Sequence, residues 1–567
     1  MNRIMKKYFY LLLLPLCIAG CKVDSGDGNQ TAVDPNKPDW YYTGGTLGTS
    51  YDETTTCFEQ ETPQVDNGWF ESFKNGEDLF EKPFMENPTG IRGGLGPVYV
   101  RSSCLHCHPG YSHGKSVPEG SYDAKNPGNG TLLVIYDTQD ESYVKWVAGM
   151  PQLFAVEPFK APIDPNKIKV TWTKATCCAA SANQFSFPDG EPFELFYPEV
   201  EMPIDAIYGY EKLQEMAANG DKNAASINHY AVKLENTIGI YGTGLTDAIP
   251  DDSITAQWAK EEQAHSAGYL KHWKTEWFEG GQWKTWYTNT IQGDGTKYVR
   301  RYTYAMSRGP ILDAAGANAI WNITNVTRSD RRYHYLDLAG TFYAKLSSQD
   351  PDVQAGWPAY IQKLIAANPE YAKYNNADST VESNIYNYLK AKDLPAEMTD
   401  NEYADLMVWH RGLAVPAARD VTSASVLRGK ELFTQIGCAQ CHRPCWTTGS
   451  DQLHDPAKFF KRNSDMPRYP YQKIWPYTDF VQHKLCMEND IRTGWCRTTP
   501  LWGKGLHQKA TGDANQARMH DTRARNVIQA IMWHGYCEQS DAFESAYQFY
   551  HLPKADRDAL VDFVNAI

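Results

Sequence analysis

Apolar residues recur at helical spacing in the last third of the chain, and they predict three helices. The first is predicted from Val426 to Gln435, and the second from Asn526 to His534 with Gly535 in the position of a C-cap. The third ends the chain, and its single apolar stripe comprises Leu560, Phe563, Val564 and Ile567.

The helix from Asn526 to His534 holds two polarisable side chains that point in different directions. Val527, Ile531 and His534 share one face at i, i+4 and i+7, while Met532 lies almost opposite. Only one of these two residues can face a cofactor bound beside the helix, and the apolar stripe selects His534 rather than Met532.

The region from 126 to 400 has a different pattern. Short alternating segments and turn signals such as Pro188-Asp189-Gly190 predict some strands. A group of tryptophans in this region is either a stacking surface or, as we favour, part of the core. The group comprises Trp258, Trp273, Trp277, Trp283 and Trp286.

The N-terminus has the pattern of a signal peptide over residues 1–20, with basic residues followed by an apolar run from Tyr8 to Ile18. The small residues before Cys21 resemble a bacterial lipobox, in which Cys21 is lipidated; the alternative is an ordinary secretory signal cut nearby. Residues 21–65 are rich in Asp, Gly, Thr and Pro and are predicted to be a lipid-anchored flexible tether.

Later stretches of the sequence are too polar for a membrane-spanning helix, which needs ~18 consecutive apolar residues. We therefore expect the body of the protein to lie outside the membrane. The predicted location is the bacterial cell envelope, with a lipid anchor in the membrane and the protein facing the periplasm or the cell surface.

Composition narrows the class of protein. The 567 residues are 42% hydrophobic and 22% charged, which suits a large buried core. A formal net charge of −13, without a basic run beyond the N-terminus, argues against nucleic-acid binding. Thirteen cysteines suit an oxidising compartment. Cys486 and Cys496 could close a local loop, although spacing does not fix the pairing.

The sequence contains an internal repeat, and each copy precedes a cysteine-containing motif. Gly76-Glu77-Asp78-Leu79-Phe80 precedes Cys104-Leu105-His106-Cys107-His108, and Gly429-Lys430-Glu431-Leu432-Phe433 precedes Cys438-Ala439-Gln440-Cys441-His442. In a Cys-x-x-Cys-His segment the two thiols add to the haem vinyl groups and the histidine binds the iron. The alternatives are a zinc site, which needs four ligands, and a redox dithiol, which does not need the histidine. Two motifs in one chain favour two covalent c-type haems.

The motifs assign the haem-holding residues directly. The expected thioether residues are Cys104, Cys107, Cys438 and Cys441, and the expected iron ligands are His108 and His442. His534 is predicted as the sixth ligand of the second haem; the alternative is a capping or core histidine. The sequence offers the first haem only His113, in a nearby loop, and the distant His229 and His334. An open iron there would suit reaction with peroxide.

The chain resembles the bacterial di-haem oxidoreductase family, often named thiol oxidoreductases, which is related to the di-haem cytochrome c peroxidases. The segments that carry the resemblance are Gly94–Val98, Phe187–Gly190, Gly244–Pro250, Leu413–Asp420, Ile474–Asp479, Thr499–Gly503, His520-Asp521, Arg523–Arg525 and Trp533–Gly535. The resemblance implies bis-histidine ligation through His534 and, by analogy with the peroxidases, calcium near the haems. The chain departs from the family at Lys484-Leu485-Cys486, where relatives carry Asp-Met-Gly after the histidine.

The expected fold is mainly α, with two cytochrome c-like haem domains and a large mixed α/β and irregular insertion between the haem motifs. The expected boundaries are 66–125 for the first haem-binding segment, 126–400 for the family-specific middle region, and 401–567 for the C-terminal cytochrome c domain.

Two functions follow from these features. The resemblance implies an oxidoreductase that reduces peroxide or oxidises thiols, exchanging electrons with a donor or acceptor protein of the envelope. Its expected helper residues are His520, Arg525, Trp475 and Trp502, each of which has a structural alternative: helix capping, a haem propionate partner, or packing. The second function is non-catalytic electron transfer for a membrane, surface redox or metal-uptake system, which requires two six-coordinate irons.

Overall fold

The fold is described from a computed structural model, which covers residues 33–86, 93, 95–122, 129–288, 296–311, 337–391, 393–394, 399–452, 466–491 and 493–567. The predicted signal peptide, Cys21 and His334 lie outside these residues. The protein is 36% helical and 14% strand, so the mainly α prediction was wrong: the fold is mixed. The strands are short and form small separate sheets.

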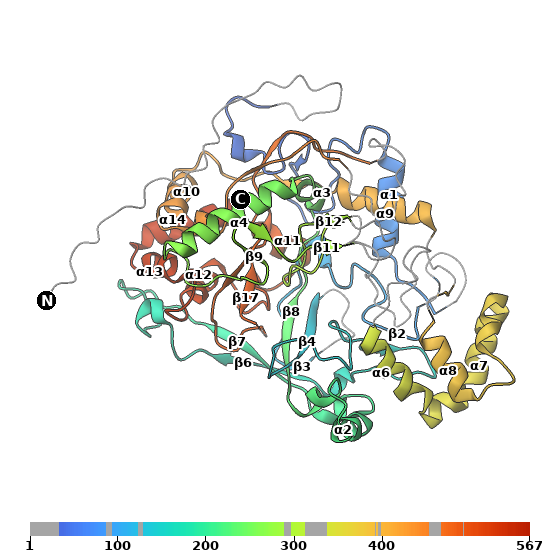
Figure 1. Ribbon diagram of the computed structural model, residues 1–567. Coiled ribbons are helices and arrows are strands. Elements are labelled where there is room, and N and C mark those ends of the chain that lie inside the picture. Colours follow the sequence, from blue (N-terminus) through green and yellow to red (C-terminus); the bar gives the residue numbers. More distant parts are fainter. Residues whose placement is uncertain are drawn as a thin grey trace.

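Two pairs of crossed helices organise the molecule. Helix α1 (Phe70–Glu81) packs on α9 (Asp400–Gly412), and α10 (Ala424–Gln435) packs on α14 (Lys554–Ala566). Figure 1 shows the two pairs on different sides of the protein. In each crossing a glycine of the repeat, Gly76 or Gly429, lies so close to the partner helix that a Cβ would collide with its backbone. Glycine is therefore needed at both crossings.

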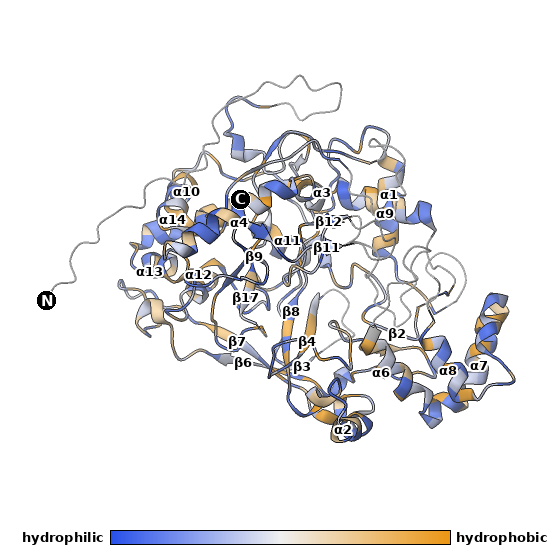
Figure 2. Ribbon diagram, in the orientation of Figure 1, coloured by the Kyte–Doolittle hydropathy of each residue, from blue (hydrophilic) through white to orange (hydrophobic). Residues whose placement is uncertain are grey.

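The three helices expected in the last third are confirmed. Besides α10 and α14, helix α12 (Val527–His534) begins where the Asn526 side chain accepts a hydrogen bond from the Gln529 N–H at 2.8 Å. Figure 2 shows orange and blue residues alternating around α10 and α14, and the whole predicted apolar stripe of α14 is buried. Burial of one apolar face holds these helices in place.

The middle region supplies the longest strands, as the alternating pattern indicated. Strand β4 (Thr131–Asp137) pairs antiparallel with β8 (Tyr230–Asn236). A second sheet has the order β3 (Gly120–Ser121), β6 (Lys169–Lys174) and β7 (Phe196–Glu201). The helices of this region are α2 (Tyr210–Ala218), α3 (Thr243–Asp247), α4 (Asp251–Ser266), α6 (Asp337–Ser348), α7 (Pro351–Ala367) and α8 (Val381–Leu389).

The remaining elements are short connections. Two-stranded sheets join β1 (Thr49–Ser50) to β13 (Val415–Pro416), β2 (Val98–Tyr99) to β5 (Phe154–Ala155), β9 (Phe278–Glu279) to β10 (Gln282–Trp283), β11 (Tyr287–Thr288) to β12 (Lys297–Tyr298), β14 (Trp446–Thr447) to β15 (Lys473–Ile474), and β16 (Gln482–Lys484) to β17 (Trp495–Arg497). Two further short helices are α11 (His507–Thr511) and α13 (Phe543–Tyr550).

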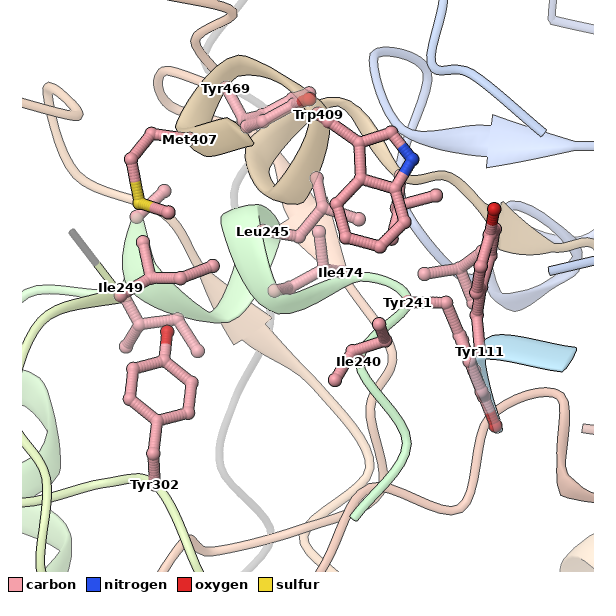
Figure 3. Close-up of a cluster of buried hydrophobic side chains, with 14 of the residues drawn as sticks. Tyr111, Ile240, Tyr241, Leu245, Ile249, Tyr302, Met407, Trp409, Tyr469 and Ile474 are labelled. Atoms are coloured by element: carbon pink, nitrogen blue, oxygen red, sulfur yellow. The ribbon is translucent and has the colours of Figure 1, made fainter. Parts of the chain in front are cut away.

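Two large apolar cores lie around the two motifs. One contains Cys104 together with residues of α1, α3, α4 and α9, and the other contains residues of α10, α12, α13 and α14 with Cys438 at its edge. Figure 3 shows part of the first core, where Met407 and Trp409 of α9 lie above Leu245 and Ile249. The tryptophan group packs in this core, three of its members being buried, which confirms the packing interpretation.

The prediction of a flexible tether over 21–65 was wrong for residues 39–65. Trp40 packs on Phe563 with ring centroids 6.1 Å apart, and Phe58 stacks on Tyr241 at 3.9 Å. Strand β1 also pairs with β13. The segment therefore contacts both haem-motif cores and is part of the fold. Within the described residues, none of the helices is both long enough and apolar enough to span a membrane.

Candidate di-haem site

The first Cys-x-x-Cys-His motif is a buried turn in the first core. The His108 N–H donates to the Cys104 carbonyl at 3.1 Å, which closes the turn, and both thiols are buried. The His108 Nδ1–H donates to the Ile238 carbonyl at 2.8 Å, so Nε2 carries no proton and can bind a metal. Burial lowers the pKa of His108 to about 4, which keeps the imidazole in its ligating, neutral form.

The second motif has the same construction. The His442 N–H donates to the Cys438 carbonyl at 2.9 Å, and Nδ1 contacts the Tyr477 carbonyl at 3.2 Å. Burial, assisted by the nearby His534, lowers the pKa of His442 to about 3. In both copies the phenylalanine of the repeat packs beside the motif histidine, with ring centroids 6.0 Å apart for Phe80 and His108 and 6.2 Å for Phe433 and His442.

His534 faces His442 across a gap of one metal ion. Their ring centroids are 6.4 Å apart. An imidazole nitrogen binds a first-row metal at about 2.0–2.1 Å and lies roughly 1.1 Å from its ring centre, so two imidazoles on one iron have centroids about 6.3 Å apart. The His534 Nδ1–H donates to the Ala530 carbonyl at 2.6 Å, which leaves Nε2 for the metal. Met532 is fully buried in the second core, whereas Ile531 and His534 of the predicted apolar stripe are half-buried.

The first motif has a histidine neighbour that the sequence did not reveal. His410 of α9 is buried, and its ring lies 5.6 Å from that of Phe80, which also packs beside His108. Burial and the proximity of His108 lower the pKa of His410 to about 3. Its Nδ1 has no hydrogen-bond partner. A thioether is also close, because Met150 packs against the small buried cluster that contains Cys107.

The histidines that the sequence offered for the first haem have other contacts. The His113 Nε2–H donates to the Ala517 carbonyl at 2.7 Å, and the ring stacks on His507 at 3.7 Å. His229 pairs with Asp137 at 2.9 Å, at the end of the β4–β8 sheet. Among the described contacts, neither His113 nor His229 forms a ring contact with the first motif like the one between His442 and His534.

A small cavity of about 40 Å³ lies beside the first core. Its walls come from the segment after β8, from Tyr302 and Tyr304, and from the segment that follows β17. Trp502, one of the predicted helper residues, is in the wall of this cavity and is otherwise buried in the first core. His113 lines the cavity from the first core.

Two buried arginines, Arg497 and Arg518, and the half-buried Lys504 line or adjoin this cavity, and the described residues show no ion pair for any of them. Arg497 Nε and both Nε and Nη1 of Arg518 are buried and make no hydrogen bond. Burial and the neighbouring arginines lower the pKa of Lys504 to about 7. Buried unpaired cations are costly, so this set calls for an anionic ligand.

A haem carries two propionate groups, and the orphaned cations fit them. Arg101, beside Cys107 in the first core, adds another buried guanidinium with Nε and Nη2 unpartnered. The residues present therefore fit two haems: Cys104, Cys107 and His108 would hold one, and Cys438, Cys441, His442 and His534 the other. When bound, the haems supply one-electron redox chemistry.

The other predicted helper residues lie outside the cavity wall. His520 donates from Nε2 to the Arg497 carbonyl at 3.0 Å, and burial lowers its pKa to about 3, so it supports Arg497 as a neutral group. The Arg525 guanidinium stacks on Phe196 at 4.6 Å, which does not support a propionate contact. Trp475 is half-buried against the second core. The sequence thus missed Arg497 and Arg518, whose roles only the fold reveals.

One further group of potential metal ligands adjoins the second motif: Cys441, Asp479 and His483. His483 Nε2 contacts Asp479 at 2.8 Å, and the buried Glu261 lies nearby at 4.0 Å. A thioether bond would commit Cys441 to the haem, which leaves too few ligands for the zinc alternative. It is the only cluster of three or more such ligands in the described part of the chain, so the expected calcium gains no support there.

A comparison with protein families finds a match for the C-terminal part of the chain. Residues 343–567 match the family described as "Di-haem oxidoreductase, putative peroxidase". This part of the chain belongs to the di-haem oxidoreductase family. The matched residues include α9 with His410, the second motif and His534, whereas the first motif lies before them. Searches of curated proteins and of solved structures give no match. The family implies haem cofactors, in agreement with the residues of the two sites.

Proposed function

We propose that the protein is an exported di-haem c-type cytochrome that reduces peroxide, with the second haem relaying electrons to the first. The observation that carries this proposal is the His442–His534 pair at 6.4 Å. Two imidazoles on one iron leave no open position for a substrate, so this site suits electron transfer. Reaction with peroxide then falls to the first motif.

The surroundings of the first motif support the assignment of peroxide reduction to this motif and of electron transfer to the second motif. Phe80 packs beside both His108 and His410, and the described residues show no ring contact between these two histidines like that of the second site. The reaction balances as one hydrogen peroxide, two electrons and two protons giving two waters. The electrons arrive singly from a donor protein of the cell envelope, and Trp502, in the wall of the cavity beside the first core, is the proposed bridge between the haems.

The family name supports oxidoreductase and peroxidase-like chemistry. Covalent haem attachment, export and a lipid anchor at Cys21 are our proposals from the sequence. Thiol oxidation, which the resemblance also implies, would use the same open iron with a thiol as the electron source.

The experiment is stopped-flow absorption spectroscopy of the purified full-length protein, reduced stepwise and mixed with hydrogen peroxide. We expect one high-spin haem, rapid reoxidation by peroxide, and steady turnover when an artificial reductant is supplied. Two low-spin haems that do not react with peroxide would overturn the proposal and favour the electron carrier.

Two matched variants assign the roles of the sites. In the double variant Cys104→Ala and Cys107→Ala, we expect the peroxide reaction to disappear while the low-spin spectrum of the second haem remains. In the double variant Cys438→Ala and Cys441→Ala, we expect peroxide to react once with the reduced first haem, but steady turnover to fall. The opposite assignment of the two losses would contradict the proposed direction of electron flow.

A further inference from the structure

The C-terminal end of helix α12 lies against the β16–β17 hairpin. The Asp541 N–H donates to the Lys484 carbonyl at 3.0 Å, and the Lys484 N–H donates to an Asp541 carboxylate oxygen at 2.9 Å. These two hydrogen bonds align the chain after β16 with the chain after α12. Each of the two aligned segments carries a cysteine, Cys486 and Cys537.

The two cysteines lie between contacts that join the same two segments. The Lys484–Asp541 hydrogen bonds lie on one side, and on the other the Tyr536 hydroxyl donates to a Glu488 carboxylate oxygen at 2.7 Å. Burial and the neighbouring Cys537 raise the pKa of Cys486 to about 11. Both residues are half-buried, so small oxidants reach them. Cys496, the partner that spacing suggested for Cys486, is instead buried opposite His483 in the hairpin.

We propose that Cys486 and Cys537 form a disulfide that fixes the end of the His534 helix. The reaction is thiol–disulfide exchange with a protein or small-molecule disulfide. The S–H bonds of Cys486 and Cys537 are lost, one S–S bond forms between them, and the oxidant disulfide is reduced to two thiols that take up the two hydrogens. An oxidising envelope compartment, as proposed above, favours the product.

The position of the bond gives it a consequence for the second site. Cys537 follows His534 by three residues, and the bond would tie it to the hairpin that carries His483 beside Cys441. The closed loop, from 486 to 537, contains the whole of α12. The disulfide therefore limits the movement by which His534 could leave the iron.

The test is peptide mapping of the full-length, haem-loaded protein after treatment with oxidised glutathione. Outside the two motifs, the described residues hold seven cysteines. We expect alkylation in denaturant to label seven of these thiols after reduction and five after oxidation. We also expect one cross-linked peptide pair joining Cys486 to Cys537, two hydrogens lighter than the separate peptides.

The variant Cys486→Ser is expected to leave all six remaining thiols alkylated and to remove the cross-linked peptide. The matched control is Cys177→Ser, because Cys177 is also half-buried near the end of α12, where it donates to the Tyr536 hydroxyl at 2.9 Å. We expect this control to keep the cross-link and show four labelled thiols. Seven labelled thiols in the oxidised wild type, or a cross-link to another cysteine, would overturn the inference.

A second readout tests the link to His534 without relying on activity. Amide hydrogen exchange of the peptide covering α12 is expected to be slower in the oxidised than in the reduced wild type, and unchanged by oxidation in Cys486→Ser. Equal exchange in both forms of the wild type would refute the role in fixing the helix. Because neither readout uses peroxide, these results stand apart from the test of peroxidase function.

Discussion

Replacement of His534 by alanine is the most direct test of the second site. The imidazole is held by its Nδ1 bond to the Ala530 carbonyl and faces His442 at the separation of a bis-histidine pair. Alanine removes the whole ring, and Met532 is buried on the other face of the helix, so it cannot take the place of the ligand without unwinding α12.

The expected size of the change in spin state follows from the number of haem sites. If His534 ligates one of two haems, its loss converts half of the total haem, and no more, from six-coordinate low spin to high spin. The variant His534→Met is expected to restore a low-spin haem with a higher reduction potential, because a methionine ligand raises the potential relative to histidine. Absorption and electron paramagnetic resonance spectra of the oxidised protein measure both effects.

The chain supplies a matched control. His551 also donates from Nδ1 to the carbonyl four residues earlier, that of Tyr547, at 2.8 Å, but it is exposed at the end of α13. His551→Ala should leave the spectrum unchanged. The reasoning is refuted if His534→Ala leaves all haem low spin, or if His551→Ala produces the same change.

Three further predictions follow from the surroundings of the sites. Arg411→Met leaves the buried carboxylates of Asp247 and Asp451 without the arginine that pairs with both. Thermal unfolding should show that the free energy of unfolding falls by about 3–5 kcal/mol. The control Arg428→Met, at an exposed ion pair, should show no measurable fall. Gly429→Ala should destabilise the α10–α14 crossing by about 1–3 kcal/mol in the same assay, because the added methyl collides with the partner backbone. Lys504→Met should lower the midpoint potential of one haem by tens of millivolts in a redox titration. The reason is that a unit charge about 10 Å away in an effective dielectric of about 20 contributes about 1.7 kcal/mol. An unchanged potential would place Lys504 away from both haems.

Local patterns in the sequence were reliable guides where the structure is local. The helix that carries His534 was predicted with its bounds because apolar residues recur there with a period of 3.6 residues, although its most buried residues include Met532 and Trp533 outside the predicted stripe. The two Cys-x-x-Cys-His motifs could be found from the sequence because their thiols and histidine lie within five residues. The strands β4 and β8 belong to the region where alternation predicted strands, although neither their pairing nor their register could be derived.

Contacts between segments that are distant along the chain left no comparable pattern in the sequence. Helix α9 is buried at every position from Leu406 to Gly412, so no stripe distinguishes His410 from its apolar neighbours. The packing of α9 on α1 joins segments more than 300 residues apart, and a predicted boundary at 401 placed α9 with the second motif. The segment around Trp40 and Phe58 lacks periodicity because single aromatic side chains, rather than a helix or strand face, hold it in the fold.

The two helix crossings show why the sites differ despite a common plan. Gly76 meets the Asp405 carbonyl and Trp409 Cβ, and Gly429 meets the Ala559 carbonyl and Phe563 Cβ. Both pairs of contacts are four residues apart, so the helices align, and His410 occupies the position of Val564. A buried imidazole with an unpartnered Nδ1 costs about 1–3 kcal/mol relative to a satisfied group, whereas valine at that position has no such cost. The first site therefore holds a polar group that the packing of α9 does not require. The asymmetry between the two sites therefore lies at the first motif, where His410 takes the place of a valine and the described residues show no facing histidine pair.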